Sequence, residues 1–233
     1  MPILTATVRA NEYVAKATRE AILEPPQGFT FQPGQYVTLL VPTPDGKKLG
    51  RSYSIASPVD SSHIVLTVKI VPEGLGSGYV DAFTPGQQVE FLGPLGRFLL
   101  SPLENPTLFV ATGAGIAPFV PMIDALLARE AAPKVTLLLG FRHREDAFYV
   151  ERFTDLAAKH PNFTFIYCLS QPDEAWTGEK GRVTTYLQEH PDLAENAQVY
   201  ICGNGSMTND VTEIAASHGV PRERIFFEKY NNL

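Results

Sequence analysis

The segment Thr107-Leu108-Phe109-Val110-Ala111-Thr112-Gly113-Ala114-Gly115-Ile116-Ala117-Pro118 decides the fold of the second half of the chain. Residues 107–112 form a continuous apolar run, which is typical of a buried parallel strand. Gly113 and Gly115 permit a tight turn, and a helix that begins near Pro118 would direct its positive N-terminus at an anion. The segment therefore predicts a nucleotide-binding turn. Because Pro118 replaces the third glycine of the dinucleotide fingerprint, a plain strand–helix turn remains an alternative.

Beyond this segment, strand and helix patterns alternate to the end of the chain. Apolar strands are predicted at 135–141, 163–169, 198–202 and 224–229, and helices at 146–159, 183–189 and 206–217. This alternation predicts a doubly wound parallel sheet, in which ligands bind beyond the carboxyl ends of the strands. Gly140 and Gly203 mark two further strand ends, which favours a nucleotide cleft there.

The first part of the chain has a different pattern, in which short strands are separated by glycine and proline. Strands are predicted at 3–9, 13–23, 36–41, 51–56, 63–71 and 88–92, with one short helix near 78–83. Many short strands with such turns predict an antiparallel β-barrel. Since 101–106 resembles a linker, we expect two domains, 1–102 and 103–233.

Composition excludes several classes of protein. The 233 residues are 44% hydrophobic and 19% charged, and the net charge of −6 provides no basic field for nucleic acid. No apolar run approaches the ~18 residues that span a bilayer, and the N-terminus lacks the regions of a signal peptide, so we expect a cytoplasmic protein. Two cysteines are too few for an iron–sulfur cluster, and five histidines without metal-type spacing predict no metal site.

Five short motifs, in order, resemble those of the ferredoxin–NADP reductase superfamily in its stand-alone form without an iron–sulfur domain. They are Arg51-Ser52-Tyr53-Ser54, Gly74-Leu75-Gly76-Ser77, Gly113 to Pro118 with Ala114 in place of the usual threonine, Cys202-Gly203 followed by Met207, and Phe227-Glu228-Lys229-Tyr230. The resemblance covers essentially the whole chain. It implies a flavin-binding β-barrel domain at 1–102 and an NAD(P)-binding α/β domain at 103–233.

The first two motifs imply a flavin site. Arg51 would offer a rigid fork of donors to a flavin phosphate, and Tyr53 would lie along the isoalloxazine ring. The resemblance places the Ser54 hydroxyl near flavin N5. Ser52, Gly74, Gly76 and Ser77 complete the expected site. A surface ion pair for Arg51, a barrel-core position for Tyr53 and a plain strand position for Ser54 remain alternatives, and FAD is favoured over FMN only by the habit of the family.

The later motifs imply a nicotinamide nucleotide site. The expected pyrophosphate-binding residues are Thr112, Gly113, Ala114, Gly115 and Gly203. Arg142, Ser170 and Arg182, with Arg144 and Lys180 nearby, lie where related enzymes hold the 2′-phosphate. Since Ser170-Gln171 replaces the Ser-Arg pair of NADP-type relatives, we expect only a small preference for NADPH, with NADH also used.

Four residues are expected at the reacting rings: Ser54, Cys202, Glu228 and Tyr230. The resemblance implies that Tyr230 covers the flavin face that nicotinamide must occupy, and that Cys202 and Glu228 position the reacting carbon. An inert buried thiol is the alternative for Cys202, and an aromatic that closes the sheet edge is the alternative for Tyr230.

The predicted activity exchanges a hydride between NAD(P)H and bound FAD and passes single electrons to or from ferredoxin or flavodoxin. The alternatives are an NAD(P)H:flavin reductase that uses diffusible flavin, an electron-transfer subunit of a larger complex, or a non-catalytic nucleotide-sensing module. Lys47, Lys48, Arg51 and Arg97 could form a basic rim for an acidic ferredoxin, although a solvated hairpin tip is the alternative for the two lysines.

Overall fold

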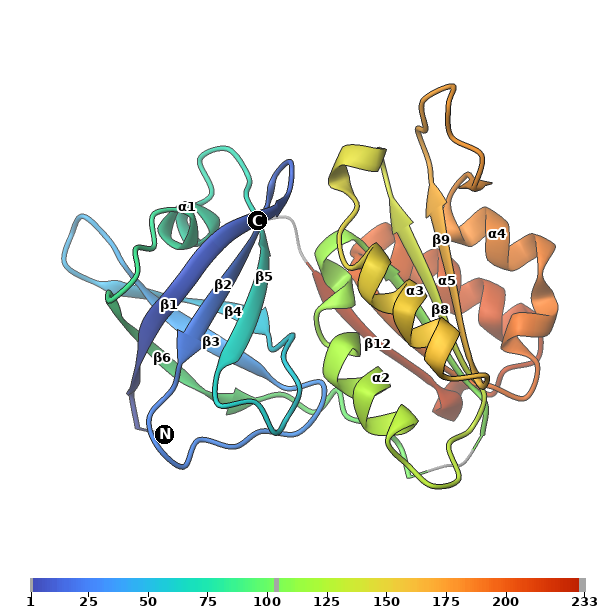
Figure 1. Ribbon diagram of the computed structural model, residues 1–233, viewed down its shortest axis with the longest axis horizontal. Helices are drawn as coiled ribbons and strands as arrows, with labels where there is room; N and C mark the ends of the chain where they lie inside the picture. Colours follow the sequence, from blue (N-terminus) through green and yellow to red (C-terminus); the bar gives the residue numbers. More distant parts are fainter. Residues whose placement is uncertain (1, 103–104, 231–233) are drawn as a thin grey trace. The chain divides into compact units, whose positions relative to one another are not determined.

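The computed structural model describes residues 2–102 and 105–230 of the chain (Figure 1). Contacts divide the chain into two compact units. The first contains the chain up to Leu100 together with Ala117–Met122, and the second contains Ser101–Ile116 and the chain from Ile123 onward. Each unit is described by itself. Among the described residues, no helix is long and apolar enough to cross a bilayer.

The first unit is an antiparallel sheet in the strand order β4-β3-β6-β1-β2-β5. Its elements are β1 (Leu4–Ala15), β2 (Thr18–Glu24), β3 (Tyr36–Pro42), β4 (Lys48–Ser54), β5 (Ile64–Lys69), α1 (Leu75–Asp81) and β6 (Gln88–Leu95). An antiparallel bridge between Ile55, directly after β4, and Leu66 in β5 joins the two ends of this order. The sheet therefore closes on itself, which confirms the predicted antiparallel barrel.

Alternation along the strands builds the barrel core. In β3, the side chains of Val37, Leu39 and Val41 are buried and those between them are partly exposed. The predicted strand over 13–23 is wrong, because the chain turns after Ala15 and returns as β2. The turn at Lys16-Ala17 contains no glycine, proline, asparagine or aspartate, so it leaves no turn signature in the sequence.

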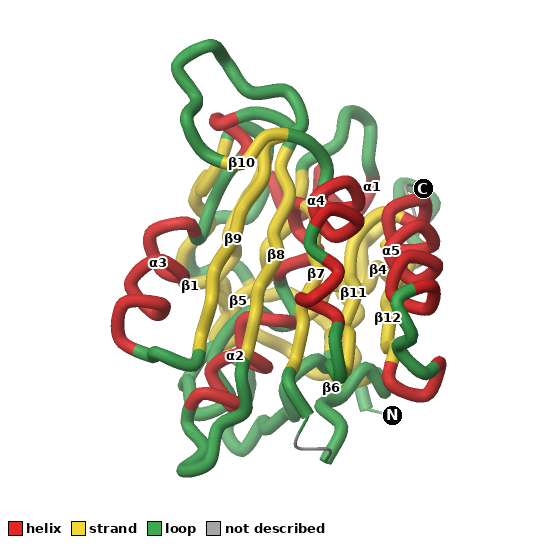
Figure 2. Tube along the Cα trace, turned by 90° about the vertical axis from the view of Figure 1, so that its right-hand side faces the viewer, coloured by secondary structure: helices red, strands yellow, loops and turns green. Residues whose placement is uncertain are grey.

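The second unit is a parallel sheet in the order β10-β9-β8-β7-β11-β12 (Figure 2). Its strands are β7 (Thr107–Thr112), β8 (Val135–Phe141), β9 (Phe163–Leu169), β10 (Glu179–Lys180), β11 (Gln198–Asn204) and β12 (Ile225–Tyr230). Its helices are α3 (Val150–Lys159), α4 (Val183–Glu189), α5 (Gly205–Ser217) and the part of α2 (Phe119–Leu127) from Ile123 onward. Its 3-10 turns are η1 (Gly113–Ile116), η2 (Arg144–Asp146), η3 (Pro191–Ala194) and η4 (Arg222–Arg224). Helices α2 and α3 lie on one face and α4 and α5 on the other (Figure 1), which confirms the doubly wound sheet.

The order of the strands places a switch point between β7 and β11. From β7 the chain proceeds through β8 and β9 on one side of the sheet, and then returns to β11 and β12 on the other. At such a point, the connections after the two central strands leave in opposite directions and open a crevice at the carboxyl edge. The residues that follow Thr112 and Cys202 therefore lie where a nucleotide would bind.

Candidate functional site

Two motifs far apart in the sequence meet in the first unit. A Cβ atom on Gly76 would lie 2.6 Å from the Tyr53 hydroxyl oxygen and 2.7 Å from Cγ of Arg51. Since real Cβ atoms essentially never approach so closely, glycine lets the first turn of α1 pack against β4 without displacing Tyr53 and Arg51. The structure thus brings the Arg51–Ser54 strand and the Gly74–Ser77 turn into one site.

The side chains of β4 divide between this site and the barrel. Arg51 is half-buried, forms no ion pair with any described residue and donates from Nη1 to the Gly50 carbonyl at 2.9 Å. Burial raises the pKa of Tyr53 to about 12, against the opposing charge of Arg51, so its hydroxyl stays protonated. Ser54 is buried, and Ser52 is exposed with its hydroxyl 3.0 Å from that of Thr38. A half-buried guanidinium without a carboxylate partner suits a phosphate.

The turn that leads into α1 is stabilised by contacts among its own residues. The Ser77 hydroxyl accepts from the Val71 N–H at 3.2 Å and lies 3.3 Å from the carbonyl of Gly74. A Cβ on Gly74 would lie 2.5 Å from the same hydroxyl, so this glycine also is sterically required. In this structure Ser77 closes the turn that would bind a flavin phosphate.

The far end of α1 is anchored to the hairpin of β1 and β2. Asn11 donates from Nδ2 to the Val80 carbonyl at 2.9 Å, and Arg19 pairs with Asp81 at 2.8 Å. These bonds fix α1, and hence the turn at its start, against the barrel wall.

In the second unit, the ends of β7 and β11 form a cradle of closely packed backbone, in which Gly115 and Gly203 are buried. A Cβ on Gly115 would lie 2.2 Å from the Cys202 carbonyl oxygen, and one on Gly203 would lie 2.4 Å from the Thr112 hydroxyl oxygen. Gly113, with φ +53°, makes the turn between β7 and η1, and Ala114 follows half-buried. The predicted pyrophosphate residues therefore converge, although a 3-10 turn separates them from α2, which begins at Phe119.

Three of the four residues expected at the reacting rings lie on β11 and β12. Cys202 is in register with Glu228, and Asn204 is in register with Tyr230. Burial raises the pKa of the Cys202 thiol well above its usual value, the Glu228 carboxylate raises it further, and a hydrogen bond with Tyr230 opposes these effects. Cys202 is therefore a neutral thiol that cannot act as a base. The fourth residue, Ser54, belongs to the first unit.

Both cysteines are buried, and burial also raises the pKa of Cys168, to about 12. Below the unfolded-state pKa of ~8.5, both states keep their thiol protons. Above it only the unfolded chain loses them, so stability should fall by ~1.4 kcal/mol per pH unit per thiol up to the folded-state pKa. Urea titrations between pH 8 and 10 should show a shallower fall for Cys202→Ala than for the unchanged protein. Equal slopes would contradict this assignment.

The residues predicted for the 2′-phosphate also lie at one edge. The Gln171 N–H donates to the Arg142 carbonyl at 2.8 Å, which ties the end of β8 to the loop after β9. The N–H of Gly181, just before Arg182, donates to Leu169 at 2.9 Å. Arg142, Ser170 and Arg182 are all exposed at the carboxyl ends of β8, β9 and β10.

Comparison with known proteins agrees with one flavin-binding and one nucleotide-binding domain. Residues 5–99 match the model of the oxidoreductase FAD-binding domain, and residues 109–213 match that of the oxidoreductase NAD-binding domain. Ferredoxin–NADP reductase B of Sorangium cellulosum is 36% identical over 88% of this chain and 87% of its own length. The chain belongs to the ferredoxin–NADP reductase family.

Relatives in this family also include electron-transfer components of oxygenases. That of toluate 1,2-dioxygenase from Pseudomonas putida is 30% identical over 86% of this chain, and the chain spans only 59% of its length. The crystal structure of an Amycolatopsis cytochrome P450 reductase is 31% identical and superimposes with a TM-score of 0.89, over 98% of this chain and 69% of that one.

The described residues fit the two cofactors that the family domains bind. Gly76 lets α1 pack closely against Arg51 and Tyr53, and Gly115 and Gly203 let the ends of β7 and β11 approach each other closely. Glycine turns of this kind are what a flavin phosphate and a nucleotide pyrophosphate would require.

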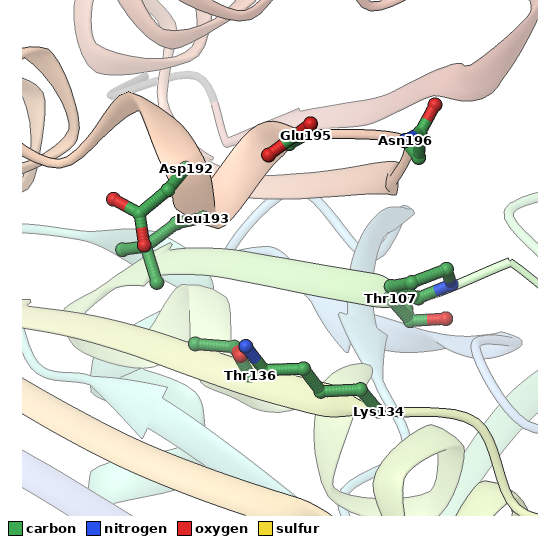
Figure 3. A pocket seen from close by; sticks show the side chains of 8 residues that line it. Thr107, Lys134, Thr136, Asp192, Leu193, Glu195 and Asn196 are labelled. Carbon is green, nitrogen blue, oxygen red and sulfur yellow. The ribbon is translucent and has the colours of Figure 1, made fainter.

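Two other features of this family member lie apart from the expected sites. A cavity of about 370 Å³ lies at the amino ends of β7 and β8, the edge opposite the nucleotide cradle (Figure 3). Its walls contain no residue predicted for either cofactor.

At the tip of the hairpin of β3 and β4, Lys47 pairs with Asp45 at 2.8 Å and Lys48 pairs with Glu90. These pairs neutralise the two lysines of the expected basic rim.

One residue at the nucleotide edge, Trp176, was not predicted from the sequence. Trp176, in the loop between β9 and β10, lies beneath the guanidinium of Arg144 at 5.7 Å. Its signal in the sequence is that it is the single tryptophan of the chain, followed closely by Gly178.

Proposed function

We propose that the chain is a flavoenzyme that exchanges a hydride between NAD(P)H and bound FAD and passes single electrons to or from ferredoxin or flavodoxin. The observation that carries this proposal is the meeting of Cys202, Glu228 and Tyr230 at the same strand ends as the cradle of Gly115 and Gly203. A flavin-binding domain at 1–102 and an NAD(P)-binding domain at 103–233 are part of the same proposal.

When bound, the flavin supplies both two-electron exchange with the nicotinamide and one-electron exchange with a protein. The chain supplies binding and orientation. Arg51 would neutralise a flavin phosphate, Tyr53 would lie along the ring, and Ser54 would offer a buried hydroxyl to its reactive edge. Glu228, Tyr230 and the neutral thiol of Cys202 shape the nicotinamide position. Such positioning can lower a barrier by ~7–11 kcal/mol without a strong base.

The phosphate-binding groups favour NADPH over NADH. Arg142 and Arg182 are exposed at the nucleotide edge, and neither forms an ion pair within the described part of the chain. A charge-assisted bond contributes ~1.5–3 kcal/mol, so even one to a 2′-phosphate would give about tenfold preference or more. Two buried free cysteines also suit a reducing compartment, which supports the cytoplasm as its location.

A second candidate is the reductase component of an oxygenase, favoured by the similarity to the toluate 1,2-dioxygenase component. In either case the electrons pass to an acceptor outside these 233 residues, because their two cysteines are too few to hold an iron–sulfur cluster.

Stopped-flow reduction of the purified protein with NADPH and NADH tests the proposal. Bound FAD should bleach with either nucleotide, faster with NADPH, and the reduced protein should then reduce ferredoxin or flavodoxin. Transfer only to an oxygenase component would favour the second candidate. A colourless protein that reduces added flavin would instead identify a diffusible-flavin reductase, and a protein that binds neither coenzyme would refute all three.

A further inference from the structure

Four basic side chains gather at the carboxyl edge of β8 and β10: Arg142, Arg144, Lys180 and Arg182. All four are exposed, and none forms an ion pair within residues 2–102 and 105–230. Five other basic side chains do pair with carboxylates: Arg9, Arg19, Lys47, Lys48 and Arg152. On a chain of net charge −6, four exposed basic groups that follow neighbouring strand ends at one edge of the sheet suit an anionic ligand there.

Among the four, Arg144 is held by an aromatic ring. Its guanidinium carbon lies 5.7 Å from the ring centroid of Trp176, within the range of a cation–π contact. Trp176 is only 7% exposed, and its Nε1 donates to the Glu179 carbonyl at 2.9 Å. Tyr167 of β9 meets the same indole edge-on at 5.1 Å. The indole is therefore a fixed platform.

The segments that carry this pair are themselves clamped. A Cβ on Gly178 would lie 2.4 Å from Cζ2 of Trp176, so the loop closes over the indole only because that residue is glycine. On the other side, Nδ1 of His143 lies 2.9 Å from the Gln171 carbonyl, and the His143 N–H donates to Asp146 at 3.1 Å. These contacts tie η2, which begins at Arg144, to the loop that carries Trp176.

We propose that Trp176 is a positioning residue for NADPH selectivity: it holds Arg144 over its ring so that the guanidinium contacts the ribose 2′-phosphate. In doubly wound sheets, the end of the second strand of the first βαβ unit lies beside the ribose, and an arginine there accommodates this phosphate. Here that strand is β8, and Arg144 follows it closely. Gln171 stands where NADP-type relatives have an arginine after the serine. The Arg144–Trp176 pair would take over the role of that missing arginine. The inference rests on the proposed function.

The single tryptophan makes the site directly observable. Trp176 emission, excited at 295 nm, should change saturably on titration with adenosine 2′,5′-bisphosphate, with 5′-AMP as the ligand that lacks the 2′-phosphate. The bisphosphate should bind about 10- to 100-fold more tightly, as expected for one or two decades per charge-assisted contact. Equal affinities would overturn the proposal.

Variants distinguish the role of Arg144 from that of Trp176. Their affinities are measured by calorimetry, because the Trp176 variants lose the fluorophore. Arg144→Gln should reduce the ratio of bisphosphate affinity to AMP affinity about 10-fold or more. Trp176→Leu should reduce the same ratio several-fold. Trp176→Phe should lose less than Trp176→Leu, because it keeps an aromatic ring beneath Arg144. The matched control is Arg222→Gln in η4, at the amino end of β12 and so at the opposite edge of the sheet. It should leave the ratio unchanged. A ratio unchanged in Arg144→Gln and Trp176→Leu would overturn the proposal, as would a fall in both affinities together.

Activity distinguishes this inference from the proposed function. In the intact holoprotein, the NADPH-to-NADH ratio of kcat/KM should fall in Arg144→Gln and Trp176→Leu by the same factors as the binding ratio. Flavin reduction with an unaltered ratio would overturn the inference alone. Absence of flavin reduction by either nucleotide in the unchanged protein would refute the proposed function, while the binding ratio would still decide the role of Trp176.

Discussion

Replacing Gly115 with alanine is expected to abolish NAD(P)H-dependent flavin reduction and to lower the free energy of unfolding by about 3 kcal/mol. The added Cβ would lie 2.2 Å from the Cys202 carbonyl oxygen and 2.6 Å from its carbonyl carbon. These are backbone atoms of a central strand, which cannot rotate away as a flexible side chain can. The ends of β7 and β11 would have to separate, and the cradle would lose its shape. Urea denaturation and stopped-flow reduction would measure the two effects.

Gly205→Ala is the matched control for this change. Gly205 begins α5 just beyond β11, and a Cβ there would meet no atom within 4 Å. The control should therefore keep its stability and its NAD(P)H affinity. If Gly115→Ala behaved like the control, the close approach of the two strand ends would not be needed for nucleotide binding.

Replacing Gly76 with alanine is expected to raise the dissociation constant of FAD about 10- to 100-fold, so that the purified protein loses much of its yellow colour. The new Cβ would displace the Tyr53 hydroxyl at 2.6 Å and the Arg51 side chain at 2.7 Å. Displacing Arg51 removes a charge-assisted bond to the flavin phosphate, and displacing Tyr53 disturbs the ring contact. Absorbance at 450 nm per protein and a fluorescence titration of the apoprotein with FAD would measure the loss.

Gly78→Ala tests whether the effect belongs to the site or to the helix. Gly78 lies in the same helix, α1, but a Cβ there would meet nothing within 4 Å. This variant should bind FAD normally and gain about 0.5–1 kcal/mol of helix stability. Full retention of FAD by Gly76→Ala would refute the assignment of the β4–α1 contact as the flavin site.

The sequence predicted the parallel strands better than the hairpins. The predicted bounds of β7, β8 and β9 agree with the structure because buried parallel strands are unbroken apolar runs that end in glycine or polar residues. The turn between β1 and β2 was missed because Lys16-Ala17 carries no turn residue. The helix predicted over 146–159 begins only at Val150, since Tyr149 before it adopts a left-handed conformation, with φ +62°.

Part of the candidate site could likewise be predicted from the sequence, and part could not. Its motifs could be found from residue type and order alone, since close backbone approach requires glycine wherever it occurs. Their partners could not be found in that way. No local pattern reveals that Gly76 faces Arg51, that Glu228 is in register with Cys202, or that the indole of Trp176 lies beneath Arg144.

By itself, the order of residues determined the two-domain architecture, the family and the glycine turns, because hydrophobic periodicity and backbone freedom are local properties of the chain. Only the tertiary structure decided which side chains meet, since strand order and register bring together residues that are far apart in the sequence. That is why the thiol of Cys202 is neutral beside Glu228, why Lys48 pairs with Glu90, and why Arg144 has a platform.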